Sequence, residues 1–326
     1  MPINKIKFMK NLMKLIKTIV SPFIFILGFI YFLISKKNYE FIHQSYVKAY
    51  CFTSGSISWL FSFLITFFEN LSFFNKSVVL EKSTNDVVKI IKNKGYVVLD
   101  QKLDDALLIK LKDLTKKIKC SGNDRQGKIN SRVIFNENLH TDPTYRYDEF
   151  ELLKNKATKD VINYFLNLNI AKKYFRSKPK LIGVSMWWST AQNVPNEFAA
   201  QNYHFDLDGI KWLKHFVYLS DVSIENGPHV YVEGTHKVFS KPYSLLKKGY
   251  TRITDVEINK YFSKDKIHEI IGDRGTIIIG DTSCFHKGKH PTKASRLVFE
   301  ITLSNSIFGP RIINKLPIDK IYNEYN

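Results

Sequence analysis

Hydrophobic and polar residues follow two different patterns along the chain, and the pattern changes near residue 180. Before that point, apolar residues recur at spacings of three and four, which is typical of amphipathic helices. They predict helices over residues 84–94, 104–119 and 148–166. Gly95 ends the first of these, and the apolar run at 96–100 predicts a short buried strand.

From residue 180 onward, apolar residues occur in short runs rich in β-branched and aromatic side chains, separated by turn formers such as Asn226-Gly227-Pro228. Several strands without helices between them indicate an antiparallel sandwich or barrel. The expected fold is therefore mainly β with flanking helices. The runs lie at 180–190, 211–222, 229–237, 275–282 and 296–306.

The first 75 residues have a different composition from the rest. A Lys-rich start, with apolar residues at helical spacing, leads into an uncharged run at 18–35. A second uncharged run covers 51–68. A run of eighteen residues is at the short end of the length that can span a bilayer as a helix. No small-residue cleavage site follows the first run, which argues against a secretory signal peptide.

Two interpretations of this segment remain open. It is a membrane anchor, as a hairpin or as helices inserted in the membrane plane, or a helical subdomain that packs on the main domain. We divide the chain into a basic, apolar N-terminal segment (1–75), a main domain (76–310) and a C-terminal tail (311–326).

Charge and cysteine content narrow the possible functions. The net charge of +19 comes almost entirely from Lys, and no zinc-finger spacing or RNP-like aromatic motif accompanies it. We therefore expect no nucleic-acid partner. Three widely spaced cysteines do not suggest a disulfide framework, which favours a reducing compartment.

Two His-x-Asp triplets occur in the chain, His140-Thr-Asp142 and His204-Phe-Asp206. Composition alone predicts about one such triplet by chance. The first lies in a polar stretch stopped by Pro143, and we expect it to be a surface turn. The second lies between two predicted strands. Because residues i and i+2 of a strand point to the same face, its side chains could hold one metal ion.

A metal site of this kind needs a third ligand. Two His and one carboxylate on one face of an octahedral iron leave three positions open. His286 stands out because it follows a strand-and-turn unit, and Arg296 comes ten residues later at the start of a strand. A guanidinium there could grip a carboxylate at two points. The other downstream candidates for the third ligand are His215, His229, His236, His268 and His290.

The motifs "YHFD", "VYLSDVSIENGPHVYVEGTHK", "GDRGTIIIGDTSCFHKG" and "SRLVFEI", in this order, resemble the phytanoyl-CoA dioxygenase-like family of Fe(II)/2-oxoglutarate oxygenases. The resemblance spans residues 78–305 and implies a double-stranded β-helix, a jelly-roll or cupin-like barrel. It implies that His204, Asp206 and His286 bind Fe(II), and that Arg296 binds the distal carboxylate of 2-oxoglutarate. The departures are Glu233 in place of the usual Pro and His229 after "NGP".

The resemblance implies hydroxylation of a substrate, coupled to decarboxylation of 2-oxoglutarate to succinate and CO2, with ascorbate as a candidate reductant. Related halogenases replace the carboxylate ligand, so Asp206 favours hydroxylation or desaturation. The alternatives are a cupin-type metal enzyme that does not use 2-oxoglutarate and a non-catalytic membrane-surface module.

The N-terminal segment suggests a small, lipid or lipid-linked substrate. The cosubstrate is cytosolic, so we expect a membrane-associated protein whose catalytic domain faces the cytoplasm, or else a cytoplasmic one.

Overall fold

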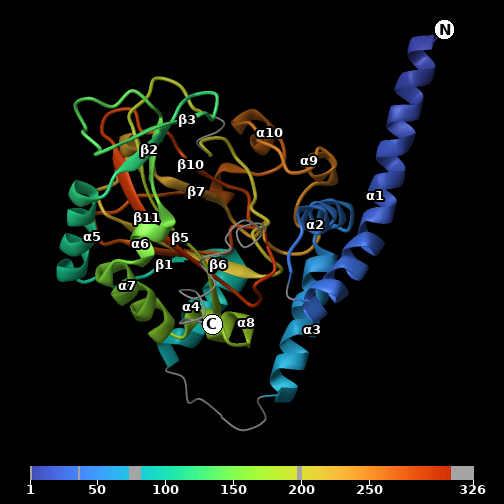
Figure 1. Cartoon of the computed structure of the whole chain (residues 1–326), viewed down its shortest axis with the longest axis horizontal. Coiled ribbons are helices and arrows are strands. Elements are labelled where there is room, and N and C mark those ends of the chain that lie inside the picture. Colours follow the sequence, from blue (N-terminus) through green and yellow to red (C-terminus); the bar gives the residue numbers. More distant parts are fainter. Residues whose placement is uncertain (1, 36, 73–81, 197–199, 310–326) are drawn as a thin grey trace.

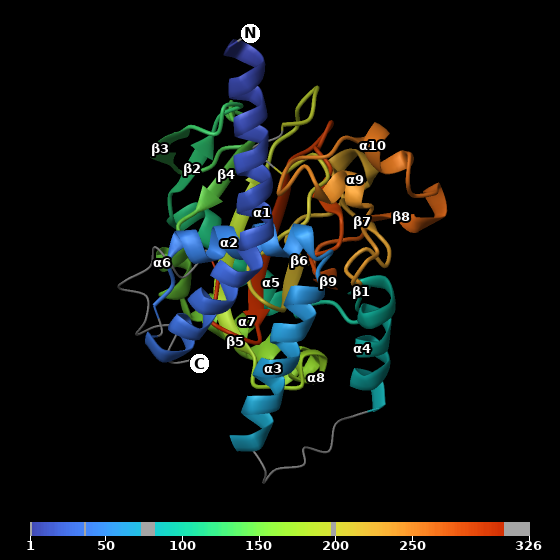
Figure 2. The same ribbon diagram turned by 90° about the vertical axis from the view of Figure 1, so that its right-hand side faces the viewer.

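Two antiparallel sheets and a set of flanking helices form the body of the protein. The computed structural model describes residues 2–35, 37–72, 82–196 and 200–309, so the predicted tail at 311–326 lies outside the described residues. Three N-terminal helices lie together on one side of this body, and α1 projects beyond it toward the N-terminus (Figures 1 and 2). These helices are α1 (Pro2–Ser35), α2 (Glu40–Phe52) and α3 (Ser56–Ser72).

The helices predicted between residues 84 and 166 are present, with one difference. The expected helix at 148–166 is two helices, because Asp148 and Asn155 each cap a new helix by accepting hydrogen bonds from backbone N–H groups. The helices of this region are α4 (Lys82–Lys94), α5 (Asp105–Lys117), α6 (Glu149–Leu153), α7 (Lys156–Asn167) and α8 (Ile170–Phe175). Two short helices, α9 (Tyr243–Leu246) and α10 (Asp255–Asn259), follow later in the chain.

The larger sheet has eight strands in the order β1-β9-β6-β11-β5-β4-β2-β3, and the smaller has three in the order β10-β7-β8. All of the pairings between these strands are antiparallel. Six of the strands coincide with predicted runs: β1 (Tyr96–Val98), β5 (Lys180–Ser189), β6 (Trp212–Tyr218), β7 (His229–Val232), β9 (Ile277–Gly280) and β11 (Arg296–Ser304).

Five strands were not predicted: β2 (Cys120–Asn123), β3 (Ile129–Val133), β4 (Thr144–Tyr147), β8 (Ile267–Ile270) and β10 (His286–Gly288). All residues of β3 are exposed. This segment is a strand because its backbone pairs with β2. Neither of its faces is buried, so its sequence shows no alternation of apolar and polar residues.

The central strands of the larger sheet, β6, β9 and β11, are buried on both faces. One face packs against α4–α8, where Trp188 stacks on Phe135 with ring centres 4.5 Å apart. The other face meets the smaller sheet, and there Trp187 shares a cluster with Phe216 and Tyr231. Neighbouring residues of β5 thus point to opposite faces, and Trp187 is the one that lines the interior between the sheets.

The N-terminal helices share a hydrophobic core with the body of the protein. Phe25 and Phe29 of α1 pack on Phe61 of α3 and on Phe308. The Tyr46 hydroxyl of α2 donates a hydrogen bond of 2.8 Å to the backbone carbonyl of Gly209. The inner faces of these helices therefore agree with the second interpretation of the segment, a helical unit packed on the main domain.

The outer faces of the same helices are apolar as well. Leu27, Ile34 and Trp59 are 69%, 80% and 63% exposed. Among the described residues, one helical stretch, Ile16–Ser35, is long and apolar enough to cross a membrane, and 28% of it is buried. The core helix of a soluble protein can meet the same test, so the contacts of the helix are more informative than its composition.

Replacing Phe25 with Ala should lower the free energy of unfolding of the whole chain by about 3–5 kcal/mol, because a fully buried aromatic ring is lost from the shared core. The matched control is Leu27→Ala on the exposed side of the same helix, with an expected change of about 0.5 kcal/mol or less. Denaturant unfolding monitored on the sheet domain measures both. Equal stability of the two variants would show that α1 is not part of the core.

Candidate metal centre

His204, Asp206 and His286 come together although the two His are 82 positions apart in the sequence. The segment that contains His204 runs antiparallel to the start of β10. The backbone N–H of His204 donates to the carbonyl of His286 at 2.9 Å, and the reciprocal bond is 2.8 Å. The N–H of Asp206 donates to the carbonyl of Thr282 at 2.8 Å. Backbone pairing thus places all three side chains side by side.

The segment around His204 is extended but is not part of a regular strand, since its pairing is limited to isolated bridges. The alternation of a strand is nevertheless kept. His204 and Asp206 face the site, and Phe205 between them points away and packs on Tyr50 of α2 and on Phe285. The predicted same-face arrangement of this His-x-Asp pair is therefore present.

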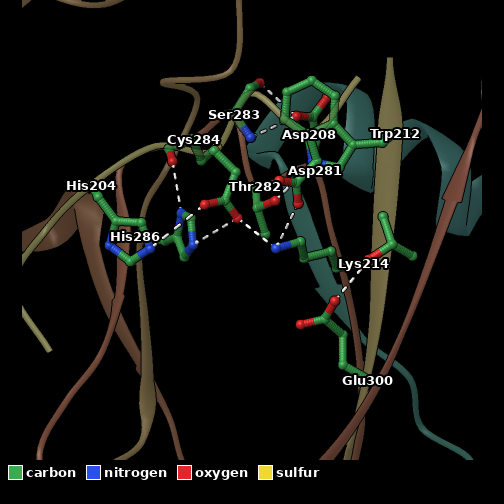
Figure 3. A network of polar contacts seen from close by, with 12 residues as sticks. His204, Asp208, Trp212, Lys214, Asp281, Thr282, Ser283, Cys284, His286 and Glu300 are labelled. Atoms are coloured by element: carbon green, nitrogen blue, oxygen red, sulfur yellow. Dashed lines mark hydrogen bonds and ion pairs between the residues drawn. The ribbon is translucent and has the colours of Figure 1, made fainter. Parts of the chain in front are cut away.

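Each imidazole is oriented by a backbone carbonyl. Nδ1 of His204 lies 3.0 Å from the carbonyl oxygen of Asn202, and Nδ1 of His286 lies 3.0 Å from that of Cys284. A carbonyl can only accept, so Nδ1 carries the proton in both rings. The lone pair of each Nε2 then faces the Asp206 carboxylate, at 3.7 Å for His204 and 3.5 Å for His286 (Figure 3). Metal-binding His side chains are commonly held in this way.

The electrostatics of the cluster also suit metal binding. Burial lowers the pKa of His204 well below its usual value, and the neighbouring His286 lowers it further. Burial lowers the pKa of His286 as well. For Asp206, burial alone would raise the pKa, but Lys214 and the two His keep it well below its usual value. Near neutral pH the cluster is two neutral imidazoles and one carboxylate.

The three ligand atoms lie within 4.8 Å of one another, and all three residues are buried. Within the described ranges, this is the only group of three His, Cys, Asp or Glu residues arranged to hold a metal ion. The donor set is that of a 2-His-1-carboxylate site, so the residues fit an octahedral Fe(II) with open positions on one side.

Lys214 is a member of the site that the sequence interpretation missed. Its Nζ atom donates to Oδ2 of Asp206 at 2.7 Å and lies 2.9 Å from Oδ2 of Asp208 (Figure 3). It is buried on β6, where the alternate positions Trp212, Phe216 and Tyr218 are aromatic. A charged residue within that aromatic alternation is the signal that could have identified it.

Tyr250 borders the site on its solvent side. Its hydroxyl lies 3.4 Å from Oδ1 of Asp206, while 48% of the residue is exposed. The Tyr250 ring also packs edge-on against Phe205, at 5.8 Å between ring centres. The loop that carries Tyr250 therefore forms part of the entrance to the cluster.

Arg296 is the first residue of β11, as predicted, and is 2% exposed. Its Nη2 donates to Ser189 Oγ at 3.4 Å, whereas Nε and Nη1 are buried with no hydrogen-bond partner among the described residues. Burial lowers the pKa of Arg296 to about 10, which leaves it charged near neutral pH. A buried cation with two unused donors is suited to binding an anion.

The position of this guanidinium relative to the metal cluster follows from β10. Nη2 of Arg296 lies over Gly288, so close that a Cβ atom there would be 3.0 Å from it. Gly288 is two residues after His286 on the same strand, and such residues share a face about 6–7 Å apart. A short dicarboxylate could therefore reach both the cluster and Arg296.

The other candidates for a third ligand lie elsewhere. His215 is on the opposite face of β6, against Phe165, and burial lowers its pKa to about 3. His229 is buried and stacks on Tyr218. Burial lowers the pKa of His229, and the charge of the nearby Arg296 lowers it further. His268 lies 3.1 Å from Glu233. His236 contacts Cys284, and His290 is not part of the cluster.

The expectation that His140 and Asp142 form a surface turn is right for the loop but wrong for Asp142. That residue is 8% exposed and accepts hydrogen bonds from the side-chain amide of Asn130 at 2.8 and 3.0 Å. Its carboxylate joins β3 to the start of β4, so the role of this Asp is structural. The three cysteines are free, in agreement with the sequence.

Comparison with known proteins gives a likeness in structure. No protein-family model matches the chain, and no curated protein resembles it in sequence. The structure is similar to that of the epimerase SnoN from nogalamycin biosynthesis, described as non-heme and alpha-ketoglutarate-dependent. The TM-score is 0.51 at 13% identity, over 71% of this chain and 87% of that one.

Two other solved structures are similar at lower scores. AviO1 from Streptomyces viridochromogenes Tue57 has a TM-score of 0.46 at 12% identity, over 72% of this chain and 99% of that one. HygX from Streptomyces hygroscopicus, with nickel and 2-oxoglutarate bound, has 0.44 at 15% identity, over 72% and 88%. The mostly antiparallel sheet with flanking helices is thus a fold that the chain shares with SnoN, and the comparison with SnoN carries this conclusion.

Proposed function

We propose that the chain is an Fe(II)/2-oxoglutarate-dependent oxygenase of the phytanoyl-CoA dioxygenase type, and that its two sheets form a double-stranded β-helix. The observation that carries the proposal is the convergence of His204 Nε2, His286 Nε2 and the Asp206 carboxylate, with both imidazoles oriented by backbone carbonyls and the carboxylate held by Lys214. The fold shared with SnoN supports it. A fold alone does not determine a reaction, so the proposal rests on the three metal-binding side chains and on the buried guanidinium of Arg296.

In this proposal His204, Asp206 and His286 hold Fe(II), and the guanidinium of Arg296, with two donors that have no partner among the described residues, binds the distal carboxylate of 2-oxoglutarate. Fe(II) with 2-oxoglutarate would supply the activation of O2, giving succinate and CO2. One oxygen atom of O2 enters succinate and the other enters a C–H bond of the substrate. Electrons balance, because 2-oxoglutarate and the substrate are each oxidised by two electrons.

The residues around the cluster would orient the reactants. Lys214 binds Oδ2 of Asp206 and keeps the carboxylate ionised in a buried place. The rings of Phe216 and Tyr218 are buried between the sheets, with Tyr218 within electrostatic range of Arg296, and they would limit the access of water. A cupin-type enzyme that does not use 2-oxoglutarate would leave the two unpaired donors of Arg296 without a role.

We also propose that the protein associates with the cytoplasmic side of a membrane and acts on a lipid or lipid-linked substrate. The outer faces of α1 and α3 are apolar, and they lie on the same side of the molecule (Figure 2). The inner face of α1 packs on the domain through Phe25, Phe29 and Phe32, so lipid cannot surround the helix. This favours insertion in the membrane plane over a span.

The metal proposal predicts that His204→Ala or Asp206→Ala lowers the affinity for Fe(II) by at least about 100-fold, since second-sphere changes alone cost 10- to 100-fold. The matched control is His140→Ala in the other His-x-Asp triplet, which should bind Fe(II) normally. Anaerobic titration of the full chain measures all three. The full chain is required because Tyr50 of α2 packs on Phe205 of the site. Unchanged affinity in Asp206→Ala would remove the ligand assignment.

The cosubstrate proposal predicts that Arg296→Met raises the KM for 2-oxoglutarate by about 10- to 100-fold, the value of a charge-assisted hydrogen bond, with Fe(II) affinity unchanged. Arg132→Met, at an exposed position, is the control. Succinate formation by the full chain with Fe(II) and ascorbate is the readout. A normal KM in Arg296→Met would show that the distal carboxylate binds elsewhere.

The membrane proposal predicts that the triple variant Leu27→Glu, Ile30→Glu and Ile34→Glu reduces binding to phosphatidylcholine vesicles by at least about tenfold, because charged groups resist insertion. The control carries Ile129→Glu, Leu139→Glu and Val256→Glu, at equally exposed apolar positions on the body of the protein. Vesicle flotation measures binding. Equal flotation of the two variants would contradict insertion of α1.

A further inference from the structure

A groove between α3 and α8 combines an aromatic wall with a group of cations. Its volume is about 360 Å³. It is bordered by a second cavity of about 350 Å³ that shares Trp59, Ser62, Lys92, Tyr174 and Lys211 with it. The two helices lie side by side at the same end of the molecule (Figures 1 and 2).

The aromatic wall is built by one side of α3. Trp59 stacks on Phe63 at 6.2 Å between ring centres, and Phe63 stacks on Phe67 at 6.3 Å. These rings follow one another at successive helical turns, and they are 63%, 55% and 49% exposed. The inner side of the same helix is buried through Ile57 and Phe61. The exposed rings are therefore not needed for packing on the domain.

The cations come from three separate segments: Lys92 of α4, Arg176 at the end of α8, and Lys211 before β6. Burial lowers the pKa of Lys92, and repulsion from Arg176 and Lys173 adds to this effect. Burial lowers the pKa of Lys211; the nearby Asp281 opposes this effect, and the charges of Lys92 and Arg176 add to it. Positive charge is thus concentrated at one place.

Carboxylates lie beside the groove and not in its described lining. None is present among the described residues that line it. Asp281 lines the neighbouring cavity, where it accepts hydrogen bonds from the hydroxyls of Tyr174 at 2.7 Å and Ser283 at 2.5 Å. Lys211 is held over the ring of Tyr174, with Nζ 4.3 Å from its centre. The arrangement is complementary to an anion.

We propose that this groove binds the anionic headgroup of a membrane phospholipid, with Lys92, Arg176 and Lys211 around the phosphate and the acyl chains along Trp59, Phe63 and Phe67. The aromatic wall lies on α3, whose buried Phe61 packs against Phe25 of α1, so a lipid along the exposed rings would lie beside the helix proposed to contact the membrane. A water-soluble phosphate would use only the cations. The inference rests on the proposed membrane association and is independent of the proposed chemistry.

The first test compares vesicles of phosphatidylcholine alone with vesicles that also contain phosphatidylglycerol, using the full chain. The groove variant carries Lys92→Gln, Arg176→Gln and Lys211→Gln. The control carries Lys110→Gln, Lys112→Gln and Lys117→Gln, three exposed charges of α5. Both lose the same charge from a chain of net charge +19, so general attraction to an anionic surface is matched.

Phosphatidylglycerol should strengthen vesicle binding of the unmodified chain and of the control. In the groove variant, the increase in vesicle affinity that phosphatidylglycerol causes should be about 10- to 100-fold smaller. The reason is that each basic residue at an anionic surface contributes about fivefold to the affinity. An equal fall in both variants would overturn the groove and leave only general electrostatic attraction. Absence of binding to any vesicle would instead overturn the membrane association. Inorganic phosphate that competes fully with the vesicles would identify a free-phosphate site.

The second test uses the fluorescence of Trp59. The other Trp residues, Trp187, Trp188 and Trp212, are at most 9% exposed, so quenching by brominated acyl chains reports on Trp59. In mixed vesicles, brominated phosphatidylglycerol should quench more than brominated phosphatidylcholine at the same mole fraction. Trp59→Phe should abolish the difference, and so should the groove variant. Equal quenching by the two lipids would contradict headgroup selection.

Discussion

The reciprocal backbone hydrogen bonds between His204 and His286 are the contact on which the candidate site depends. They join two segments that are distant in sequence, and they set the register in which Asp206 faces both imidazoles. A shift by one residue would turn Phe205 toward the site and both ligands away from it. The same register places Gly288 under Arg296, two residues beyond His286. One pairing thus positions the metal ligands and the anion-binding cation together.

The alternation of that segment also connects the site to the N-terminal helices. Phe205 points away from the cluster into the core that Tyr50 of α2 shares with Phe285. Lys241 is buried nearby, with Nζ within 6 Å of the rings of Tyr50, Phe205 and Phe285. The N-terminal segment therefore supports the wall that carries the ligands. Its inner face belongs to the domain and its outer face is apolar and exposed, which supports the proposed membrane association.

The buried and partly buried cations of the protein differ in whether an acidic side chain compensates their charge. Lys214 is paired with Asp206 and Asp208, so its charge is compensated within the site. Within the part of the chain that the structure describes, two donors of Arg296 have no partner, and the groove that Lys92, Arg176 and Lys211 line contains no carboxylate. Compensated cations orient neighbouring groups, whereas uncompensated ones in partly buried places are suited to anionic ligands. This difference separates the role proposed for Lys214 from those of Arg296 and the groove.

The sequence by itself determined the helices and the apolar strands, because their periodicities of 3.6 and 2 are local. It also singled out His204, Asp206 and His286 as a donor set and Arg296 as a cation at a strand start. The tertiary structure showed how the two His-x-Asp triplets differ, since Asp142 is held by Asn130 and Asp206 by Lys214 of β6. The tertiary structure also decided that the polar segment β3 is a strand, that Lys214 belongs to the site, and that α1–α3 pack on the domain. Each depends on contacts between segments distant in sequence, and such contacts leave no local pattern.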